Sequence, residues 1–122
     1  MGQDVEARRI PVSKQTVYSY RFKPTKDGRL FDPTIGYSQF VSRAEELLDS
    51  DEETTHVVVT DIADFYPRIY HHRLENALQA TTKKINHVKA LMGLLAGWNG
   101  CESYGIPVGS GPVRLLAEAT LI

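Results

Sequence analysis

The sequence predicts an α+β fold in which a small antiparallel sheet packs against helices. Residues 16–22 alternate in polarity, which is typical of a strand with one buried face. Residues 56–62 hold three adjacent valines without alternation, which indicates a central strand buried on both faces. Several other segments repeat apolar residues at helical spacing. Together, the two periodicities predict strands and helices in one small domain.

The helices are predicted from their apolar stripes and from the residues at their ends. The first covers residues 37–48 and stops before an acidic loop. The second begins at Pro67, because proline suits the first helical turn, where its missing N–H costs nothing. The third covers residues 86–98 and ends near Gly100, a residue type that favours helix C-termini. The fourth begins at Pro112 and continues to the last apolar residues.

The remaining segments are predicted to be irregular. Residues 1–14 show no periodicity and are expected to form a frayed lead, and Asp27-Gly28 is a pair typical of hairpin turns. Trp98 is expected to anchor the core or the end of its helix. The adjacent His71 and His72 would diverge by about 100° on a helix. We therefore expect solvated or capping histidines rather than a metal cluster.

Composition limits the classes of protein that the chain can belong to. Its 122 residues, 42% of them hydrophobic, fit one globular domain. The formal net charge of −1 conceals a basic excess in residues 1–30 and an acidic excess in the rest. This asymmetry suits a polyanion on one side and metal ions on the other, although a random surface distribution explains it equally well. One cysteine, Cys101, fits a reducing cytoplasm, and no run approaches the ~20 apolar residues of a membrane span.

Two motifs in order connect the chain with a known family. The stretch "VVVTDIADFYPRI" (57–69) resembles the first catalytic motif of reverse transcriptases, in which an apolar strand leads to an aspartate and an aromatic residue follows. The stretch "YGIPVGSGPVRLLAEATL" (104–121) resembles the second palm motif of that family. The upstream "VYSYRF" and "GRLFDP" look most similar to the bacterial abortive-infection, phage-defence and retron-like branch. The resemblance covers residues 16–122.

The resemblance implies a metal site at the end of the valine strand. Asp61 would coordinate both catalytic metal ions, and the carbonyl of Ile62 would add a ligand to one of them. The ions would be Mg²⁺, or Mn²⁺ in its place, and they would assist attack of a primer 3′-oxygen on the nucleotide. On the strand and the aspartate alone, a structural Asp61 that caps the next turn is also possible.

The resemblance also implies a site for the incoming deoxynucleotide. The amides of Asp64 and Phe65 would face its triphosphate, and the ring of Tyr66 would exclude a 2′-hydroxyl group. The glycine-rich loop would approach the nascent base pair through Val108 and Gly109. Arg21 is a candidate phosphate contact, with a solvent-facing strand arginine as the equally good alternative.

The resemblance divides residues 1–122 into a fingers-like part, 1–55, and a palm-like part, 56–122. It implies a nucleotidyltransferase, an RNA-directed DNA polymerase of antiviral defence, whose partners are dNTPs and an RNA or DNA template and primer. The tyrosine-x-aspartate-aspartate hairpin of the family is absent from these residues. We therefore interpret the chain as a partial fingers–palm domain, truncated before that hairpin. We expect it to be inactive alone and to self-associate through its apolar final helix.

Two further interpretations stay open. One is a non-catalytic nucleic-acid-binding or assembly module with a reverse-transcriptase-like shape, which the missing hairpin favours. Val108 favours it too, because the family often has glutamine there. Val113 and Arg114 also depart from the common serine and proline. The other interpretation is an unrelated α+β domain in which Asp61 is structural.

Overall fold

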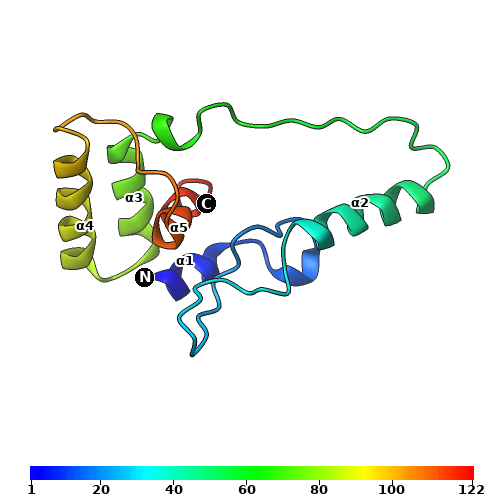
Figure 1. Cartoon of the computed structure of the whole chain (residues 1–122), viewed down its shortest axis with the longest axis horizontal. Coiled ribbons are helices and arrows are strands. Elements are labelled where there is room, and N and C mark those ends of the chain that lie inside the picture. Colours follow the sequence, from blue (N-terminus) through cyan, green and yellow to red (C-terminus); the bar gives the residue numbers. More distant parts are fainter.

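Helices supply nearly all the regular structure of residues 1–122, all of which the computed structural model describes (Figure 1). The α-helices are α1 (Gly2–Arg8), α2 (Tyr37–Ser50), α3 (His71–Thr81), α4 (Ile85–Trp98) and α5 (Gly111–Ala119). Two 3₁₀ turns, η1 (Val12–Lys14) and η2 (Tyr66–Arg68), complete the set. Helix α3 packs on α4, α1 and α5, whereas α2 extends away from this group (Figure 1).

The core lies between α1, α3, α4 and α5. Helix α5 is the most buried element, because its apolar residues lie on a broad face that meets α1 and α3. Leu74 and Leu78 of α3 are completely buried, as are Val5 of α1 and Val88 and Leu95 of α4. Helix α2 has no buried residue, and none of the helices combines the length and apolar composition needed to cross a bilayer.

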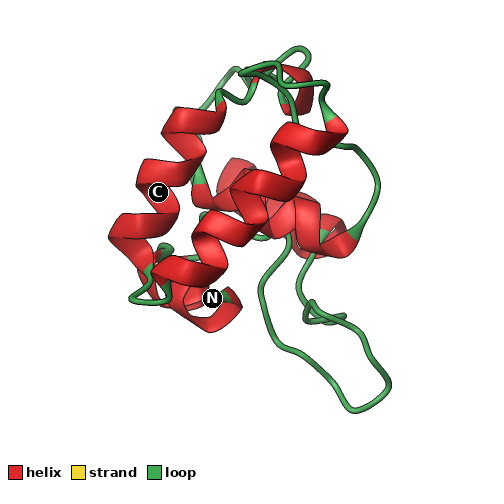
Figure 2. Ribbon diagram, turned by 90° about the vertical axis from the view of Figure 1, so that its left-hand side faces the viewer, coloured by secondary structure: helices red, strands yellow, loops and turns green.

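The predicted antiparallel sheet, and with it the α+β fold class, is wrong. Figure 2 shows helices and loops without a strand. Extended pairing is limited to two isolated antiparallel bridges, Phe22 with Phe31 and Tyr70 with Tyr104. The alternating residues 16–22 contribute only Phe22 to this pairing. Alternating polarity indicates residues that suit a pleated, half-buried surface. Such residues form a sheet only where neighbouring strands supply hydrogen-bond partners.

The valine segment shows this most clearly. Residues 55–63 run as an extended connection between α2 and η2, and their backbone makes no hydrogen bond to other backbone groups. Val58 and Val59 are 84% and 89% exposed, so the expected burial on both faces is wrong. Figure 1 shows the connection passing at a distance from the packed helices. No second strand of the chain lies alongside it.

The helix predictions were more accurate, with exceptions in the first residues, at the start of the second helix and at Trp98. The predicted helices at 37–48 and 86–98 are confirmed as α2 and α4. The final helix is confirmed as α5, but it ends at Ala119 and does not continue to the last apolar residues. Helix α4 ends where predicted: Gly100 has a φ of +62°, and the Cys101 amide donates to the Ala96 carbonyl. The second helix begins later than Pro67, which lies in η2. The lead is not frayed, since α1 forms there, and Trp98 is 65% exposed rather than an anchor.

Truncating one valine in α1 and one in the valine segment distinguishes the observed structure from the predicted buried strand. Val5→Ala should lower the free energy of unfolding by about 2 kcal/mol, because Val5 is fully buried and its methyl groups leave a void. Val59→Ala should change it by less than about 0.5 kcal/mol, because Val59 faces water. Urea denaturation followed by circular dichroism measures both. A larger loss for Val59→Ala would favour the buried strand that the sequence predicts.

Candidate functional site

The structure joins the two motif segments through their backbones. The Ile106 amide donates to the Tyr66 carbonyl at 3.1 Å, and the Gly105 amide donates to the Ile69 carbonyl at 2.9 Å. Gly105 has a φ of +87°, and a Cβ there would lie 3.4 Å from the Pro67 carbonyl oxygen. Glycine is thus suited both to the turn and to the close approach. The segment that contains Tyr66 and the glycine-rich loop are therefore neighbours, as the resemblance implies.

A side-chain clamp fixes the loop onto α3 and the end of α4. His71 Nε2 lies 2.6 Å from the Gly105 carbonyl oxygen, which only accepts, so this ring nitrogen bears the proton. Asn99 Nδ2 donates to the same oxygen and, at 2.8 Å, to the Tyr104 carbonyl. His71 is buried, so the expectation of a solvated or capping histidine is wrong for this residue.

Removing the clamp should loosen the loop while the helices stay folded. In Asn99→Ala, the Tyr104 carbonyl loses its donor and Gly105 keeps only His71, so we expect a loss of about 1–2 kcal/mol. Amide hydrogen exchange should accelerate at Gly105 and Ile106. Thr81→Ala, which removes a hydroxyl bonded only within α3, is the control and should leave both amides unchanged. Unchanged exchange in Asn99→Ala would show that the loop does not depend on the clamp.

Tyr66, the predicted sugar-selecting residue, sits between the core and solvent. Its ring packs against the core together with that of Phe65, the two centroids 5.9 Å apart in an edge-to-face arrangement. Burial is the main cause that raises the pKa of the Tyr66 hydroxyl, and the neighbouring Tyr20 adds to it. The hydroxyl therefore stays neutral across the physiological range and presents a rigid, uncharged edge.

The residues before Tyr66 are held less firmly. Asp61 and Ile62 are exposed, and the Asp61 carboxylate makes no hydrogen bond or ion pair with another side chain. Asp64 is exposed with a φ of +55°, and its carboxylate lies 3.5 Å from Arg68. The structure therefore supplies a defined turn at Asp64 but no contact that directs Asp61 toward Tyr66.

The residues present do not fit the two-ion centre that the resemblance implies. No group of three or more histidine, cysteine, aspartate or glutamate side chains converges anywhere in residues 1–122. Asp61 brings a single carboxylate, and Asp64 is engaged by Arg68. Two divalent cations need more oxygen ligands than this pair provides. The roles of Asp61 and Ile62 as metal ligands stay predictions.

The loop presents its predicted nucleotide contacts to solvent. Val108 is 73% exposed, and Gly109 has a φ of +116° with open space where a side chain would be. Ser110 follows and precedes the first turn of α5. The structure thus brings Tyr66 and the base of this loop together, and it leaves the tip of the loop free to meet a ligand.

Arg21 is directed inward and is held by groups of the chain itself. Its guanidinium lies 2.7 Å from Glu6 and donates to the Ile10 carbonyl, and its side chain is 5% exposed. Burial lowers the pKa of Arg21, with Glu6 as the main opposing influence. The alternative of a solvent-facing strand arginine is therefore wrong. The role in phosphate binding remains untested.

Sequence reasoning missed the ion network around Arg21. Arg9 lies 2.8 Å from Glu118 and 3.3 Å from Glu6, and it donates to the carbonyls of Ser19 and Tyr20. The network ties the end of α1 to Ser19 and Tyr20 and to α5. A heptad or strand pattern does not reveal such pairs, because the partners are far apart in sequence. Two of the basic side chains of residues 1–30, Arg9 and Arg21, are therefore paired inside the fold.

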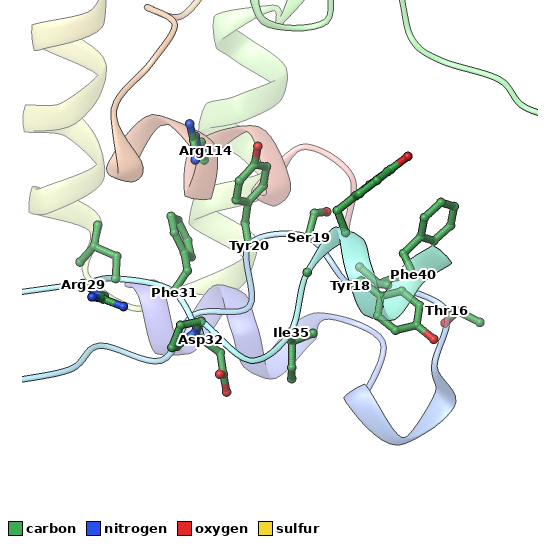
Figure 3. Close-up of a pocket in the computed structure, with 15 residues that line it drawn as sticks. Thr16, Tyr18, Ser19, Tyr20, Arg29, Phe31, Asp32, Ile35, Phe40 and Arg114 are labelled. Atoms are coloured by element: carbon green, nitrogen blue, oxygen red, sulfur yellow. The ribbon is translucent and has the colours of Figure 1, made fainter. Parts of the chain in front are cut away.

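A cavity lined by aromatic side chains was also missed. It has a volume of about 790 Å³ and lies between residues 16–20, residues 29–33, the start of α2 and Arg114 of α5 (Figure 3). The alternating pattern of residues 16–22 did point to an aromatic face, but it did not show that this face remains uncovered.

Comparison of the chain with protein-family models, curated proteins and solved structures found no match.

Proposed function

We propose that this chain forms the nucleotide-binding part of an RNA-directed DNA polymerase that acts in the cytoplasm, in bacterial defence against phage. The observation that carries the proposal is the pairing of the two motif segments, in which the Ile106 and Gly105 amides bond to the carbonyls of Tyr66 and Ile69. The motifs are distant in sequence, and a chance match would not require them to be adjacent.

The chemistry of this junction fits a nucleotide. The half-buried Tyr66 ring offers a rigid surface for a sugar, and the exposed Val108 and Gly109 offer backbone close by. The left-handed turn at Asp64 leaves the amides of Asp64 and Phe65 outside any backbone hydrogen bond. These unpaired donors are the type of group that binds phosphate oxygens.

The free thiol of Cys101 agrees with a reducing compartment.

Nucleotide titration of the ¹⁵N-labelled chain tests the proposal. Adding dUTP with Mg²⁺ should shift the amide resonances of Phe65, Tyr66 and Gly109. UTP, which differs only by its 2′-hydroxyl group, should bind more weakly. Tyr66→Ala should remove this difference, because the ring that excludes the hydroxyl is gone. Trp98→Ala, a loss of an exposed aromatic ring on α4, is the matched control and should preserve it.

Two results would contradict the proposal. One is the absence of shifts at the junction at millimolar dUTP. The other is equal binding of dUTP and UTP by the unaltered chain, which would remove the role assigned to Tyr66. Primer extension by the 122-residue chain is expected to stay at background, and incorporation above background would refute the expectation that it is inactive alone.

A further inference from the structure

The aromatic cavity has the form of a stacking site. Tyr20 and Phe31 pair at one end, with ring centroids 5.5 Å apart, and Tyr18 and Phe40 pair at the other, 6.1 Å apart. Figure 3 shows the two pairs on either side of Ile35. Tyr37, at the start of α2, is 81% exposed although it lines the cavity. Aromatic surfaces left open in this way favour a flat, apolar ligand face.

One cation at the cavity has no anionic partner. The Arg114 guanidinium lies over the Tyr20 ring, 4.9 Å from its centroid, and it forms no ion pair or hydrogen bond. The other charged groups of the lining are already engaged. Arg29 pairs with Asp27 at 3.0 Å, and Asp32 pairs with Lys23 at 2.8 Å. The Lys23 ammonium is the main cause that lowers the pKa of Asp32 to about 2, so this carboxylate stays ionised and paired.

The available groups therefore recognise a planar ring joined to an anion. A guanidinium half-shielded by an aromatic ring binds a phosphate oxygen more strongly than a fully hydrated cation does, because less water must be displaced. Exposed aromatic rings stack on any nucleobase, since every base has a π-face. A ligand with a carboxylate alone would leave most of the aromatic lining uncovered.

We propose that this cavity binds a nucleotide unit of a single-stranded nucleic acid, with its base against Tyr37 and Phe40 and its phosphate on Arg114. The inference deepens the proposed function and rests on it for the choice of a nucleic acid over other planar anions. The cavity and the junction of Tyr66 with Ile106 are lined by different residues, and Arg114 and Tyr20 of the cavity also lie close enough to influence the Tyr66 hydroxyl.

Fluorescence anisotropy of a labelled oligothymidylate of about twelve nucleotides tests this site in the full chain. Arg114→Gln should weaken binding about tenfold and lower the slope of log affinity against log salt by about one. Tyr37→Leu should weaken binding at least about fivefold while it leaves that slope unchanged. The second variant changes an exposed side chain, so it keeps the test valid even where loss of Arg114 disturbs the fold.

Matched controls separate the cavity from the general surface. Lys89→Gln removes an exposed cation of α4, and Trp98→Leu removes an exposed ring there; both should leave the affinity unchanged. Equal weakening by these controls, or no weakening in Arg114→Gln and Tyr37→Leu, would overturn the proposal. Competition by dTMP as strong as that by the oligonucleotide would also overturn it, because it would assign the site to a free nucleotide.

The two proposals fail in different ways. If the junction does not bind dUTP but the oligonucleotide binds through Arg114 and Tyr37, the polymerase proposal falls and a nucleic-acid-binding module remains. If dUTP shifts the Tyr66 and Gly109 resonances but the cavity variants bind the oligonucleotide normally, the cavity proposal alone falls.

Discussion

Arg9→Ala is expected to lower the free energy of unfolding by about 3–5 kcal/mol. The Arg9 side chain is 3% exposed and holds four partners at once, namely the carboxylates of Glu6 and Glu118 and the carbonyls of Ser19 and Tyr20. Its removal leaves the buried Glu118 carboxylate without its ion-pair partner. The carbonyl oxygens of Ser19 and Tyr20 also lose their hydrogen-bond donor. Thermal and urea unfolding followed by circular dichroism would measure the loss.

The control for this prediction is an arginine with one exposed partner. Arg43 pairs only with Glu46 at 3.0 Å on the outer helix α2, and both side chains are solvated. Arg43→Ala should therefore cost less than about 0.5 kcal/mol. A loss in Arg9→Ala as small as that in Arg43→Ala would show that the network contributes little to stability.

The effect of Arg9→Ala should depend on pH. Burial raises the pKa of Glu118 above 4.5, and Arg9 is the strongest opposing influence. The folded chain therefore holds the Glu118 proton more tightly than the unfolded chain does. The contribution of this proton to the free energy of unfolding is complete below pH 4.5 and declines as pH rises through the raised pKa. Without Arg9 the pKa rises further. The loss should therefore be smaller at pH 4.5 than at pH 7, and a second change, Glu118→Gln, should recover part of it at pH 7.

Leu78→Ala is the other substitution expected to have a large effect. Leu78 is fully buried in α3, and its truncation removes apolar contacts and leaves a cavity that helices cannot fill without moving, so we expect a loss of about 3 kcal/mol. Leu94→Ala makes the same change on α4 at a side chain that is 59% exposed, and should cost less than about 0.5 kcal/mol. Similar losses for the two leucines, measured by urea denaturation, would mean that α3 and α4 pack on other faces.

Local patterns predicted the helices because a helix satisfies its own backbone. Leu74 and Leu78 stand four residues apart, which places them on one face of a helix, and both are buried in α3. A strand depends on distant partners, and the sequence of the valine segment cannot show whether they are present. Val5 was missed for a related reason, since one apolar side chain in a short polar helix has no period to detect.

The candidate site was predicted only in part. The motifs correctly suggested that Tyr66 and the glycine-rich loop belong together, because turn geometry is encoded in glycines such as Gly105. The inward direction of Arg21 could not be predicted, because it depends on Glu6 in α1, and the sequence pattern did not predict that helix. The clamp by His71 and Asn99 also joins residues from separate elements, and only the folded chain brings their nitrogens to one carbonyl.

The extended connection at residues 55–63 has a consequence for how the chain withstands cutting. Proteases bind their substrates as extended backbone, so this uncovered stretch offers them accessible scissile bonds. A nick there would leave two polypeptides, one ending with α2 and one beginning near η2. Arg9 and Val5 belong to the first piece, and Glu118 and the faces of α3 and α5 belong to the second. The pieces would therefore stay associated after the covalent link is lost, as a heterodimer made from one gene product.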